Sequence, residues 1–278
     1  MTNTKNYALV TGGTSGMGLE YARQLAGRGY NVIVAALPGR HDADGNPVGP
    51  PSPEVICSLL AAEHPGLDFL PIGIDLARTD AAKELCDRIA AERPEAFVEV
   101  LINNAGILNA RHFREMTAAQ IQRELLLHNF TTTMLCHHLL PAMKERGRGY
   151  VLTVSSLAAW LPFPFITTYA ATKEFNRTLV RGLRTEYRGT GVKIATVYFG
   201  AVDTPLYNLK PSLRRLARRL RVMISPEEAA RKALKMLFAG RSGRMPGVVN
   251  HLARFVCVQL PSPLVAWLDR KVTKKLNS

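Results

Sequence analysis

Short apolar segments alternate with helix-like segments along most of this chain, and this alternation narrows the folds open to it more than any other feature. The apolar segments cover 7–13, 31–36, 68–76, 98–106, 149–156 and 192–200, and helical patterns cover 17–28, 81–92, 117–146 and 169–190. Strands that alternate with helices predict a parallel sheet with crossover helices on both faces. Strands that are apolar at nearly every position fit a sheet buried on both sides. We therefore expect an α/β fold with a doubly wound parallel sheet.

Length, composition and the lack of a linker bear on the number of domains. The chain has 278 residues, of which 47% are hydrophobic and 21% charged, a balance typical of globular proteins. That length allows one large α/β domain or two small ones. Because the sequence shows neither a linker nor an internal repeat, we expect a single domain over residues 1–278.

The cysteines and the apolar runs bear on the cellular compartment in which the protein is expected. Cys57, Cys86, Cys136 and Cys257 form no CxxC pair, which favours reduced thiols in an intracellular protein. The first residues lack the apolar run of a signal peptide. No apolar run reaches the ~18 residues needed to span a bilayer. We expect a cytoplasmic protein, with peripheral membrane contact left open.

The chain is strongly basic, with a formal net charge of +14. Such a field suits nucleic acid, an anionic cofactor, an acidic carrier or an anionic membrane, and it also serves solubility alone. The basic residues are not interleaved with stacking aromatics and no nucleic-acid motif occurs, so we expect no nucleic-acid partner.

Two segments depart from the alternating pattern. Residues 38–53 are rich in proline and glycine, which predicts a surface loop after the second strand. Residues 209–221 hold six basic residues and no acidic one, with leucines on one helical face. A helix then begins with Ser225 as N-cap, Pro226 at the first helical position and Glu228 at the third.

A glycine-rich turn follows the first strand and precedes a helix. It comprises Gly12, Thr14, Ser15, Gly16, Met17 and Gly18. Gly12 allows the sharp turn, Gly16 lets a diphosphate approach the backbone amides, and Gly18 permits close packing of helix on strand. Free N–H groups and the helix dipole then hold the phosphates. The GxxxGxG spacing in this context predicts a Rossmann-type dinucleotide site rather than a mere tight turn.

The end of the second strand bears on the choice of dinucleotide. Sites that prefer NAD often carry an acid there that holds the ribose hydroxyls. Here the first acid is Asp42, and Arg40 stands before it, where it can meet a 2′-phosphate. We therefore favour NADP(H) over NAD(H), although Arg40 can also be read as an exposed loop cation.

Two further strand ends border the expected cofactor site. Asp75 and Leu76 end the third strand, where they can approach the adenine. Asn103 is expected to brace the strands, while Ala105 and Gly106 leave room for a ribose. Open α/β sheets bind their ligands at these carboxyl ends of strands.

The candidate catalytic groups follow the fifth strand. Ser156 ends that strand, and Tyr169 and Lys173 lie one helical turn apart on the next helix. A phenol with a pKa near 10 is a poor acid or base at neutral pH, but a neighbouring ammonium favours its ionised form. Tyr169 can then protonate a carbonyl oxygen as hydride arrives, while Ser156 holds that oxygen and Lys173 also holds the nicotinamide ribose. Asn129, on the preceding helix, is expected to anchor a water that relays the proton.

With these motifs in this order, the chain resembles a short-chain dehydrogenase/reductase over about residues 6 to 205. The resemblance implies NAD(P)(H), a sheet of about seven strands, and a Ser–Tyr–Lys set with a supporting Asn, matched by the residues just named. The loop after the sixth strand lacks the family's usual Pro-Gly, yet Gly200, Val202 and Thr204 still fit contacts to the nicotinamide carboxamide. The family also implies a homo-oligomer, either a dimer or a tetramer.

The segment between Ser156 and the catalytic helix is expected to line the substrate. Trp160, Phe163 and Phe165 offer an apolar wall suited to a steroid, a long acyl chain or another greasy ketone, or they are core or oligomer contacts. The tail, with SPEEAARKAL, RMPGVVN and a late LPSP, is similar to long-chain 3-oxoacyl and 17β-hydroxysteroid reductases.

Two later segments are expected to regulate access to the site. Residues 205–224 are predicted to form a substrate lid, within which 209–221 can also contact an acyl carrier or an anionic membrane. Residues 245–278 are an apolar and then basic extension, which can cover the active site or touch a membrane.

The sequence favours an enzyme without metal. His128, His137 and His138 are accompanied by no carboxylate cluster, so we expect no metal ion. The leading hypothesis is an NADP(H)-dependent oxidoreductase that interconverts a ketone and a secondary alcohol on a bulky hydrophobic substrate. The alternatives are a catalytically silent cofactor sensor, and a carrier- or membrane-associated scaffold.

Overall fold

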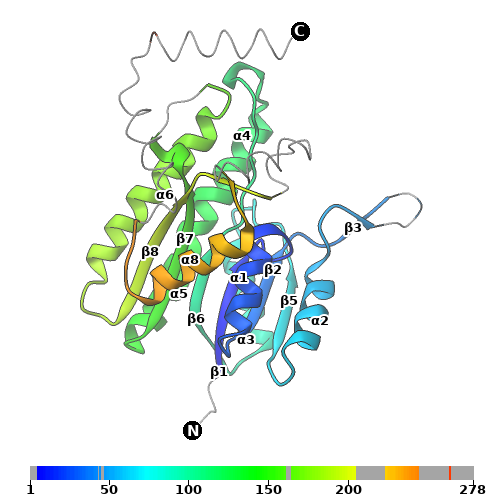
Figure 1. The fold of residues 1–278 in the computed structure, drawn as a ribbon, viewed down its shortest axis with the longest axis vertical. Helices are drawn as coiled ribbons and strands as arrows, with labels where there is room; N and C mark the ends of the chain where they lie inside the picture. The colour runs from blue at the N-terminus through cyan, green and yellow to red at the C-terminus, as the bar shows by residue number, and fades with distance from the viewer. Residues whose placement is uncertain are drawn as a thin grey trace.

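The computed structural model describes residues 5–42, 44, 47–160, 164–204, 223–243 and 263. Its centre is a parallel six-stranded sheet in the order β5-β2-β1-β6-β7-β8 (Figure 1). The strands are β1 (Lys5–Thr11), β2 (Asn31–Ala36), β5 (Phe69–Gly73), β6 (Ala96–Asn103), β7 (Gly149–Ser156) and β8 (Val192–Phe199). The predicted doubly wound parallel sheet is confirmed, and the described residues supply six of the roughly seven strands expected.

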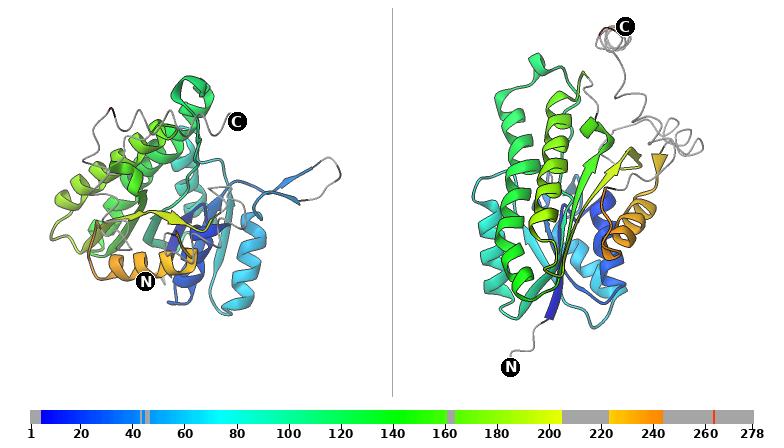
Figure 2. Two further views of the ribbon diagram at one scale, coloured as in Figure 1. Left: turned by 45° about the horizontal axis from the view of Figure 1, so that its top comes forward. Right: turned by 90° about the vertical axis from the view of Figure 1, so that its left-hand side faces the viewer.

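Helices cover both faces of the sheet, as the right-hand view of Figure 2 shows. One layer is α1 (Gly16–Ala26), α2 (Pro53–Glu63) and α8 (Pro226–Phe238); the other is α3 (Ala81–Glu92), α4 (Ala118–Leu125), α5 (Thr131–Glu145) and α6 (Thr167–Glu186). Successive strand residues feed opposite layers, because Val10 packs in the first core and Leu9 in the second. Both residues are fully buried, which is why these strands are apolar at nearly every position.

The segment 38–53 is more ordered than a plain loop. It contains a short antiparallel hairpin, β3 (Arg40–His41) with β4 (Pro47–Val48), and α2 then begins at Pro53. The helix expected at Ser225 is confirmed, because the Ser225 hydroxyl accepts a hydrogen bond from the Glu228 amide at 3.2 Å. A two-residue pairing of β9 (Ala201–Val202) with β10 (Met223–Ile224) follows β8.

The predicted helix over 117–146 is interrupted. A π-turn, η2 (Leu126–Phe130), separates α4 from α5. The wider turn rotates the residues that follow it relative to a regular α-helix, and π-turns are frequent at functional sites. A regular 3.6-residue pattern cannot reveal such an insertion.

Several predictions fall outside the described residues. These are Phe163, the basic segment 209–221, the lid 205–224 apart from β10, and the extension 245–278 apart from Pro263. Among the helices that the structure does describe, none is long and apolar enough to cross a bilayer.

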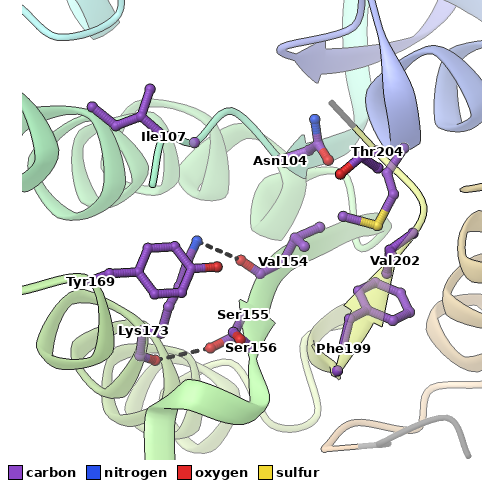
Figure 3. A pocket seen from close by; sticks show the side chains of 13 residues that line it. Asn104, Ile107, Val154, Ser155, Ser156, Tyr169, Lys173, Phe199, Val202 and Thr204 are labelled. Atoms are coloured by element: carbon purple, nitrogen blue, oxygen red, sulfur yellow. Dashed lines mark hydrogen bonds between the residues drawn. The ribbon is translucent and has the colours of Figure 1, made fainter. Parts of the chain in front are cut away.

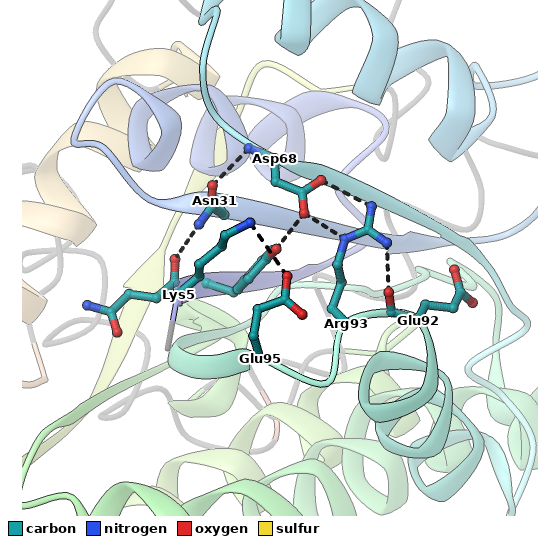
Figure 4. Close-up of polar contacts among 8 residues, drawn as sticks. Lys5, Asn31, Asp68, Glu92, Arg93 and Glu95 are labelled. Carbon is teal, nitrogen blue, oxygen red and sulfur yellow. Dashed lines mark hydrogen bonds and ion pairs between the residues drawn. The ribbon is translucent and has the colours of Figure 1, made fainter. Parts of the chain in front are cut away.

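A polar network ties the strands together at the amino end of the sheet, away from the carboxyl strand ends (Figure 4). Asp68 accepts hydrogen bonds from the Tyr7 hydroxyl at 2.5 Å and from Arg93 Nε at 2.6 Å and a second guanidinium nitrogen at 3.1 Å. Its own amide donates to Asn31 at 2.8 Å. The Arg93 hydrogen bonds are the largest influence on the pKa of Asp68; burial opposes them, and the net pKa is lowered.

We expect Asp68→Asn to lower the free energy of unfolding by about 1–2 kcal/mol at pH 7, since charge-assisted hydrogen bonds contribute roughly this much after solvent screening. A lowered folded-state pKa gives stability that is present above the unfolded pKa and is lost as pH falls through the folded value. The difference from wild type should therefore shrink below about pH 4. Urea unfolding at pH 7 and pH 3 measures it, with Glu92→Gln, which removes an exposed acid paired with Arg88, as the matched control. Equal losses in the two variants would contradict this account.

Candidate active site

The glycine turn forms one wall of a cleft of about 490 Å³ at the carboxyl ends of the strands. Gly12 has φ +66°, which an L side chain rarely adopts. A Cβ on Gly18 would lie 1.9 Å from the Gly12 carbonyl oxygen, so α1 can approach β1 only without a side chain there. Ser15 is the N-cap of α1 and its side chain makes no capping hydrogen bond, which leaves the first amides of α1 to a ligand.

Most residues predicted to bind the cofactor line this one cleft. They are Gly12, Thr14, Ser15, Gly16, Met17, Gly18, Arg40, Asp75, Leu76, Ala105, Gly106 and Thr204. The cleft volume lies within the range of about 300–1,000 Å³ typical of small-molecule and cofactor sites. A glycine cradle, unpaired helix amides and this volume together fit a dinucleotide.

Asn103 does not have the position expected for it. Its side-chain amide donates to Cys136 Sγ on α5 at 3.6 Å, and it does not line the cleft. The neighbouring Asn104 braces the strands instead, since its side chain donates to the Thr11 carbonyl at 2.9 Å. The Thr11 hydroxyl in turn accepts the amides of Asn104 and Ala105, each at 3.0 Å. Asn103 still belongs to β6, so its side chain turns toward the helix layer.

Asp75 is held in place by an arginine that sequence reasoning missed. Arg123, on α4, donates two hydrogen bonds to its carboxylate, at 2.9 and 3.1 Å, and also lines the cleft. Burial alone would raise the pKa of Asp75, but the hydrogen bonds from Arg123 and the Ala77 amide outweigh it and lower the pKa. An ionised, fixed carboxylate at this strand end is suited to accept from an adenine amino group.

Ser156, Tyr169 and Lys173 meet in a smaller pocket of about 60 Å³. Figure 3 shows the Tyr169 hydroxyl pointing into this pocket, with the Lys173 amino group beside its ring. Lys173 Nζ lies 5.3 Å from the centre of that ring and donates to the Val154 carbonyl at 3.3 Å. A phenol, an ammonium and a hydroxyl from two elements therefore face one small space.

Backbone contacts fix these groups. The Ser155 hydroxyl donates to the Lys173 carbonyl at 2.9 Å, which fastens α6 to the end of β7. The Ser156 hydroxyl oxygen accepts from the Ala158 amide at 3.1 Å, which orients it. Burial lowers the pKa of Lys173 to about 8, with the charge of Glu124 acting in the opposite direction.

Asn129 lies in η2 and holds the catalytic helix. Its side-chain amide donates to the Thr172 carbonyl at 2.9 Å and approaches Asn176 Oδ1 at 3.4 Å. It does not line the pocket itself. The π-turn directs this side chain toward α6.

His128, which sequence reasoning considered only as a metal ligand, packs beside the candidate site between Ile107 and Thr172. Its ring is fully buried, with Nε2 accepting from the Ile107 amide at 3.0 Å and Nδ1 lying 2.9 Å from the Thr172 hydroxyl. Burial lowers its pKa well below the usual value, and Lys173 adds to this. A neutral ring with the proton on Nδ1 satisfies both contacts. No group of three candidate metal ligands occurs among the residues that the structure describes.

The cleft and the pocket adjoin each other. Met17, Asn104, Gly106, Ile107 and Thr204 line both of them. Gly200, Val202 and Phe199 complete the pocket wall from the end of β8. The candidate catalytic groups therefore lie next to one end of the cleft.

Two residues of the predicted aromatic wall, Trp160 and Phe165, are described by the structure, and both pack against other side chains. Trp160 packs on Tyr198, with ring centres 4.3 Å apart, and under the Arg177 guanidinium. Phe165 has φ +67° and packs on His112 at 4.0 Å. Neither residue lines the pocket or the cleft. Trp160 has a packing role because the Tyr198 side chain lies on the α6 side of β8.

Comparison with known proteins identifies a matching family model and similar oxidoreductases. A family model described as short chain dehydrogenase matches residues 6–212. An uncharacterized oxidoreductase of Myxococcus xanthus (strain DK1622) is 32% identical over 201 residues, which cover 72% of this chain and 73% of that protein. The very-long-chain 3-oxoacyl-CoA reductase of Homo sapiens is 27% identical over 277 residues, 98% of this chain and 79% of that protein.

A solved structure has the same fold. The short-chain dehydrogenase from Sphingobium yanoikuyae in complex with NADPH is similar with a TM-score of 0.71, covering 93% of this chain and 97% of that one. The two sequences are 21% identical, so this likeness concerns the fold alone.

Proposed function

Because this chain belongs to the short-chain dehydrogenase family, we propose that it interconverts a ketone and a secondary alcohol on a bulky hydrophobic substrate with NADP(H) as cofactor. The family assignment makes it an NAD(P)-dependent oxidoreductase; the substrate and the preference for NADP(H) are the proposal. The observation that carries it is the shared pocket of Ser156, Tyr169 and Lys173, which adjoins the glycine-lined cleft.

The proposed chemistry assigns one task to each catalytic side chain. A nicotinamide cofactor bound in the cleft supplies or accepts the hydride. Tyr169 gives its proton to the substrate oxygen during reduction and takes it back during oxidation. Ser156 donates a hydrogen bond to the same oxygen, and Lys173 favours the Tyr169 phenolate and holds the nicotinamide ribose. We assign contacts with the carboxamide to Val202 and Thr204, which line the same pocket.

Asn129 supports this set indirectly. Its amide nitrogen is committed to α6, so a proton-relay water would bind at its carbonyl oxygen Oδ1. We assign Asn129 this relay role as part of the proposal. Its structural basis is the hydrogen bond from the Asn129 amide to the Thr172 carbonyl, which fixes the Asn129 side chain.

The preference for NADP(H) depends on Arg40. Arg40 lies in the cleft wall beside Leu37 and Pro38. Asp75, which follows β5, is the one acidic residue among the cleft-lining residues that the structure describes. A guanidinium in β3, shortly after the end of β2, favours a 2′-phosphate, which carries negative charge that a ribose hydroxyl lacks.

We expect Arg40→Ala to weaken NADPH about tenfold or more and NADH less than about twofold, because a charge-assisted contact to phosphate contributes roughly 1.5–3 kcal/mol. Fluorescence titration of both cofactors measures this. Arg114→Ala, which removes an exposed cation paired with Glu115, is the matched control. Equal losses for NADPH and NADH would make Arg40 an ordinary loop cation.

The apolar substrate class is supported by the pocket walls and by the similarity to 3-oxoacyl-CoA reductase. Ile107, Val154, Phe199 and Val202 surround the catalytic groups. An absorbance screen at the nicotinamide band, with NADPH and NADH against 3-oxoacyl and hydroxysteroid panels, tests this. We expect turnover of a bulky ketone with NADPH; consumption of only small polar ketones would contradict it.

The alternatives predict different results. A silent cofactor sensor has no need of all three groups of the Ser156–Tyr169–Lys173 set, and it would bind NADPH without turnover. A carrier- or membrane-associated scaffold would show itself in liposome and carrier pull-downs that depend on the arginines of 209–221.

A homo-oligomer is part of the proposal. Leu125, Phe130 and Phe175 are 46%, 39% and 46% exposed on α4, η2 and α6, where a second copy can cover them. Analytical ultracentrifugation that finds only a monomer would overturn it.

A further inference from the structure

A buried histidine beside the catalytic helix has no part in the chemistry described so far. His128, in η2, is 1% exposed and belongs to no group of candidate metal ligands among the described residues. Its backbone carbonyl accepts a hydrogen bond from the Asn176 side chain at 3.1 Å, which fixes its main chain to α6. Burying a polar ring is costly unless its nitrogens are paired, so the partners of this ring show what it does.

The ring joins the cofactor cleft to the catalytic helix. Nε2 accepts from the amide of Ile107, a residue that lines both the cleft and the pocket, at 3.0 Å. Nδ1 lies 2.9 Å from the Thr172 hydroxyl, and that hydroxyl donates to the Tyr169 carbonyl at 2.7 Å. The histidine and Tyr169 rings also pack edge to face, with their centres 5.7 Å apart. One side chain therefore holds Tyr169 both at its backbone and at its ring.

The donors and acceptors along this path allow one arrangement of protons. The Ile107 N–H can only donate, so Nε2 carries no proton. In a neutral ring the proton is then on Nδ1, which donates to the Thr172 oxygen. The Thr172 hydroxyl proton is left for the Tyr169 carbonyl. The hydrogen bonds thus run in one direction, from Ile107 to Tyr169.

The loop backbone also lies directly against the ring. A Cβ on Gly106 would lie 3.1 Å from Nε2 and 3.6 Å from Cδ2 of His128, and the first of these distances is tighter than an ordinary contact. Gly106 lines the cleft and the pocket, as Ile107 does. A shift of the ring therefore shifts the part of the loop that borders both spaces.

We propose that His128 is a positioning residue, which couples the loop at Gly106 and Ile107 to the turn of α6 that carries Tyr169. While its hydrogen bonds are closed, the cofactor cleft and the Tyr169 phenol keep one relative position. The proposal rests on the proposed function for its catalytic consequence alone, because these hydrogen bonds exist without substrate. An apolar ring would serve equally well if His128 only filled space, whereas the coupling needs both nitrogens.

The direct test determines which ring nitrogen of His128 carries the proton. The protein is labelled with ¹⁵N-histidine and studied at about pH 8, where an ordinary histidine is neutral. Nitrogen chemical shifts distinguish a protonated from a bare ring nitrogen, and the His128 signals are assigned by their loss in His128→Phe or their shift in Thr172→Val. We expect a proton on Nδ1 and none on Nε2. His137, exposed on α5, should show a mixture of both forms and is the internal reference. The same mixture at His128, or a proton on its Nε2, overturns the proposal.

Two variants separate the two ends of the coupling. His128→Phe keeps an aromatic ring but loses both nitrogens. We expect it to lower kcat about tenfold or more and to weaken NADPH about threefold or more, since a small displacement of a reacting group is costly and a lost hydrogen bond is worth roughly this much. Thr172→Val breaks the link to Tyr169 and keeps the link to Ile107. Its kcat should fall similarly, while the dissociation constant of NADPH stays within about twofold of wild type.

Thr185→Val is the matched control. The Thr185 hydroxyl also donates to a carbonyl of α6, that of Arg181 at 3.1 Å, and Thr185 lies outside the catalytic pocket and the cleft. This variant should keep the wild-type rate and affinity. Thr172→Ser, which keeps the hydroxyl, should recover most of the rate that Thr172→Val loses.

Wild-type kcat in either His128→Phe or Thr172→Val would overturn the coupling, as would a loss in Thr172→Val that Thr172→Ser does not relieve. Lack of turnover in wild type would count against the proposed function alone. In that case the position of the ring proton and the NADPH affinity of His128→Phe still decide the role of His128.

Discussion

Tyr169→Phe should lower kcat by about 10²–10⁴-fold while the dissociation constant of NADPH stays within about twofold of wild type. The size follows from the rate that a positioned general acid or base contributes. Cofactor binding should persist because the side chain keeps its ring beside Lys173 and loses only the hydroxyl that points into the pocket (Figure 3). Initial rates with NADPH and the preferred ketone, together with a fluorescence titration of NADPH, measure the two quantities.

The control for this variant is another tyrosine of the same helix region. Tyr187 directly follows α6 at its far end and lies outside the pocket, so Tyr187→Phe should keep the wild-type rate. Unchanged turnover in Tyr169→Phe would remove the proposed proton transfer. Loss of NADPH affinity together with turnover would instead indicate that the phenol maintains the cleft.

Gly18→Ala should abolish measurable cofactor binding or weaken it at least about tenfold, and lower the free energy of unfolding by about 1–3 kcal/mol, as overpacking typically does. A Cβ at this position would lie 1.9 Å from the Gly12 carbonyl oxygen and 2.7 Å from Asn104 Nδ2. Both neighbours are fixed, one as backbone and the other by its hydrogen bond to Thr11, so α1 must move away from the strand. The amides that are proposed to hold the phosphates would move with it.

Gly182 provides the matched control on α6. A Cβ there meets nothing within 4 Å, so Gly182→Ala should be neutral or stabilise the protein by about 0.5–1 kcal/mol. Thermal unfolding and NADPH titration of both variants make the comparison. Wild-type affinity in Gly18→Ala would contradict the assigned role of the glycine turn.

The sequence predicted most of the fold because its strands are buried on both faces. Such strands are apolar at nearly every position, so their positions can be predicted without knowledge of their partners. The pairing of Tyr169 with Lys173 was equally legible, since residues four apart share a helix face. Both follow from local geometry.

Features that depend on where a helix or strand ends could not be predicted from the sequence. Asn103 and Asn104 are adjacent and alike, and only the end of β6 after Asn103 decides which one turns toward β1. Likewise, the π-turn at 126–130 inserts into a pattern that reads as one helix, and it turns His128 and Asn129 toward α6. Local periodicity carries no sign of either.

The sequence also did not predict which polar side chains make contacts inside the protein. Glu124 and Arg123 are polar residues of an amphipathic helix, which a sequence pattern assigns to the solvent face. In the structure they contact Thr168 and Asp75, residues distant in sequence, and these tertiary contacts explain their positions. Trp160 is the opposite case, an aromatic residue near the site whose ring packs against Tyr198.

The most direct test of the account is a crystal structure of the protein with NADPH and an unreactive ketone analogue. We expect the nicotinamide ring in the pocket lined by Val202 and Thr204, with the analogue's carbonyl oxygen within about 3 Å of both the Tyr169 and Ser156 hydroxyls. A dinucleotide bound elsewhere, or a carbonyl oxygen out of reach of Tyr169, would contradict it.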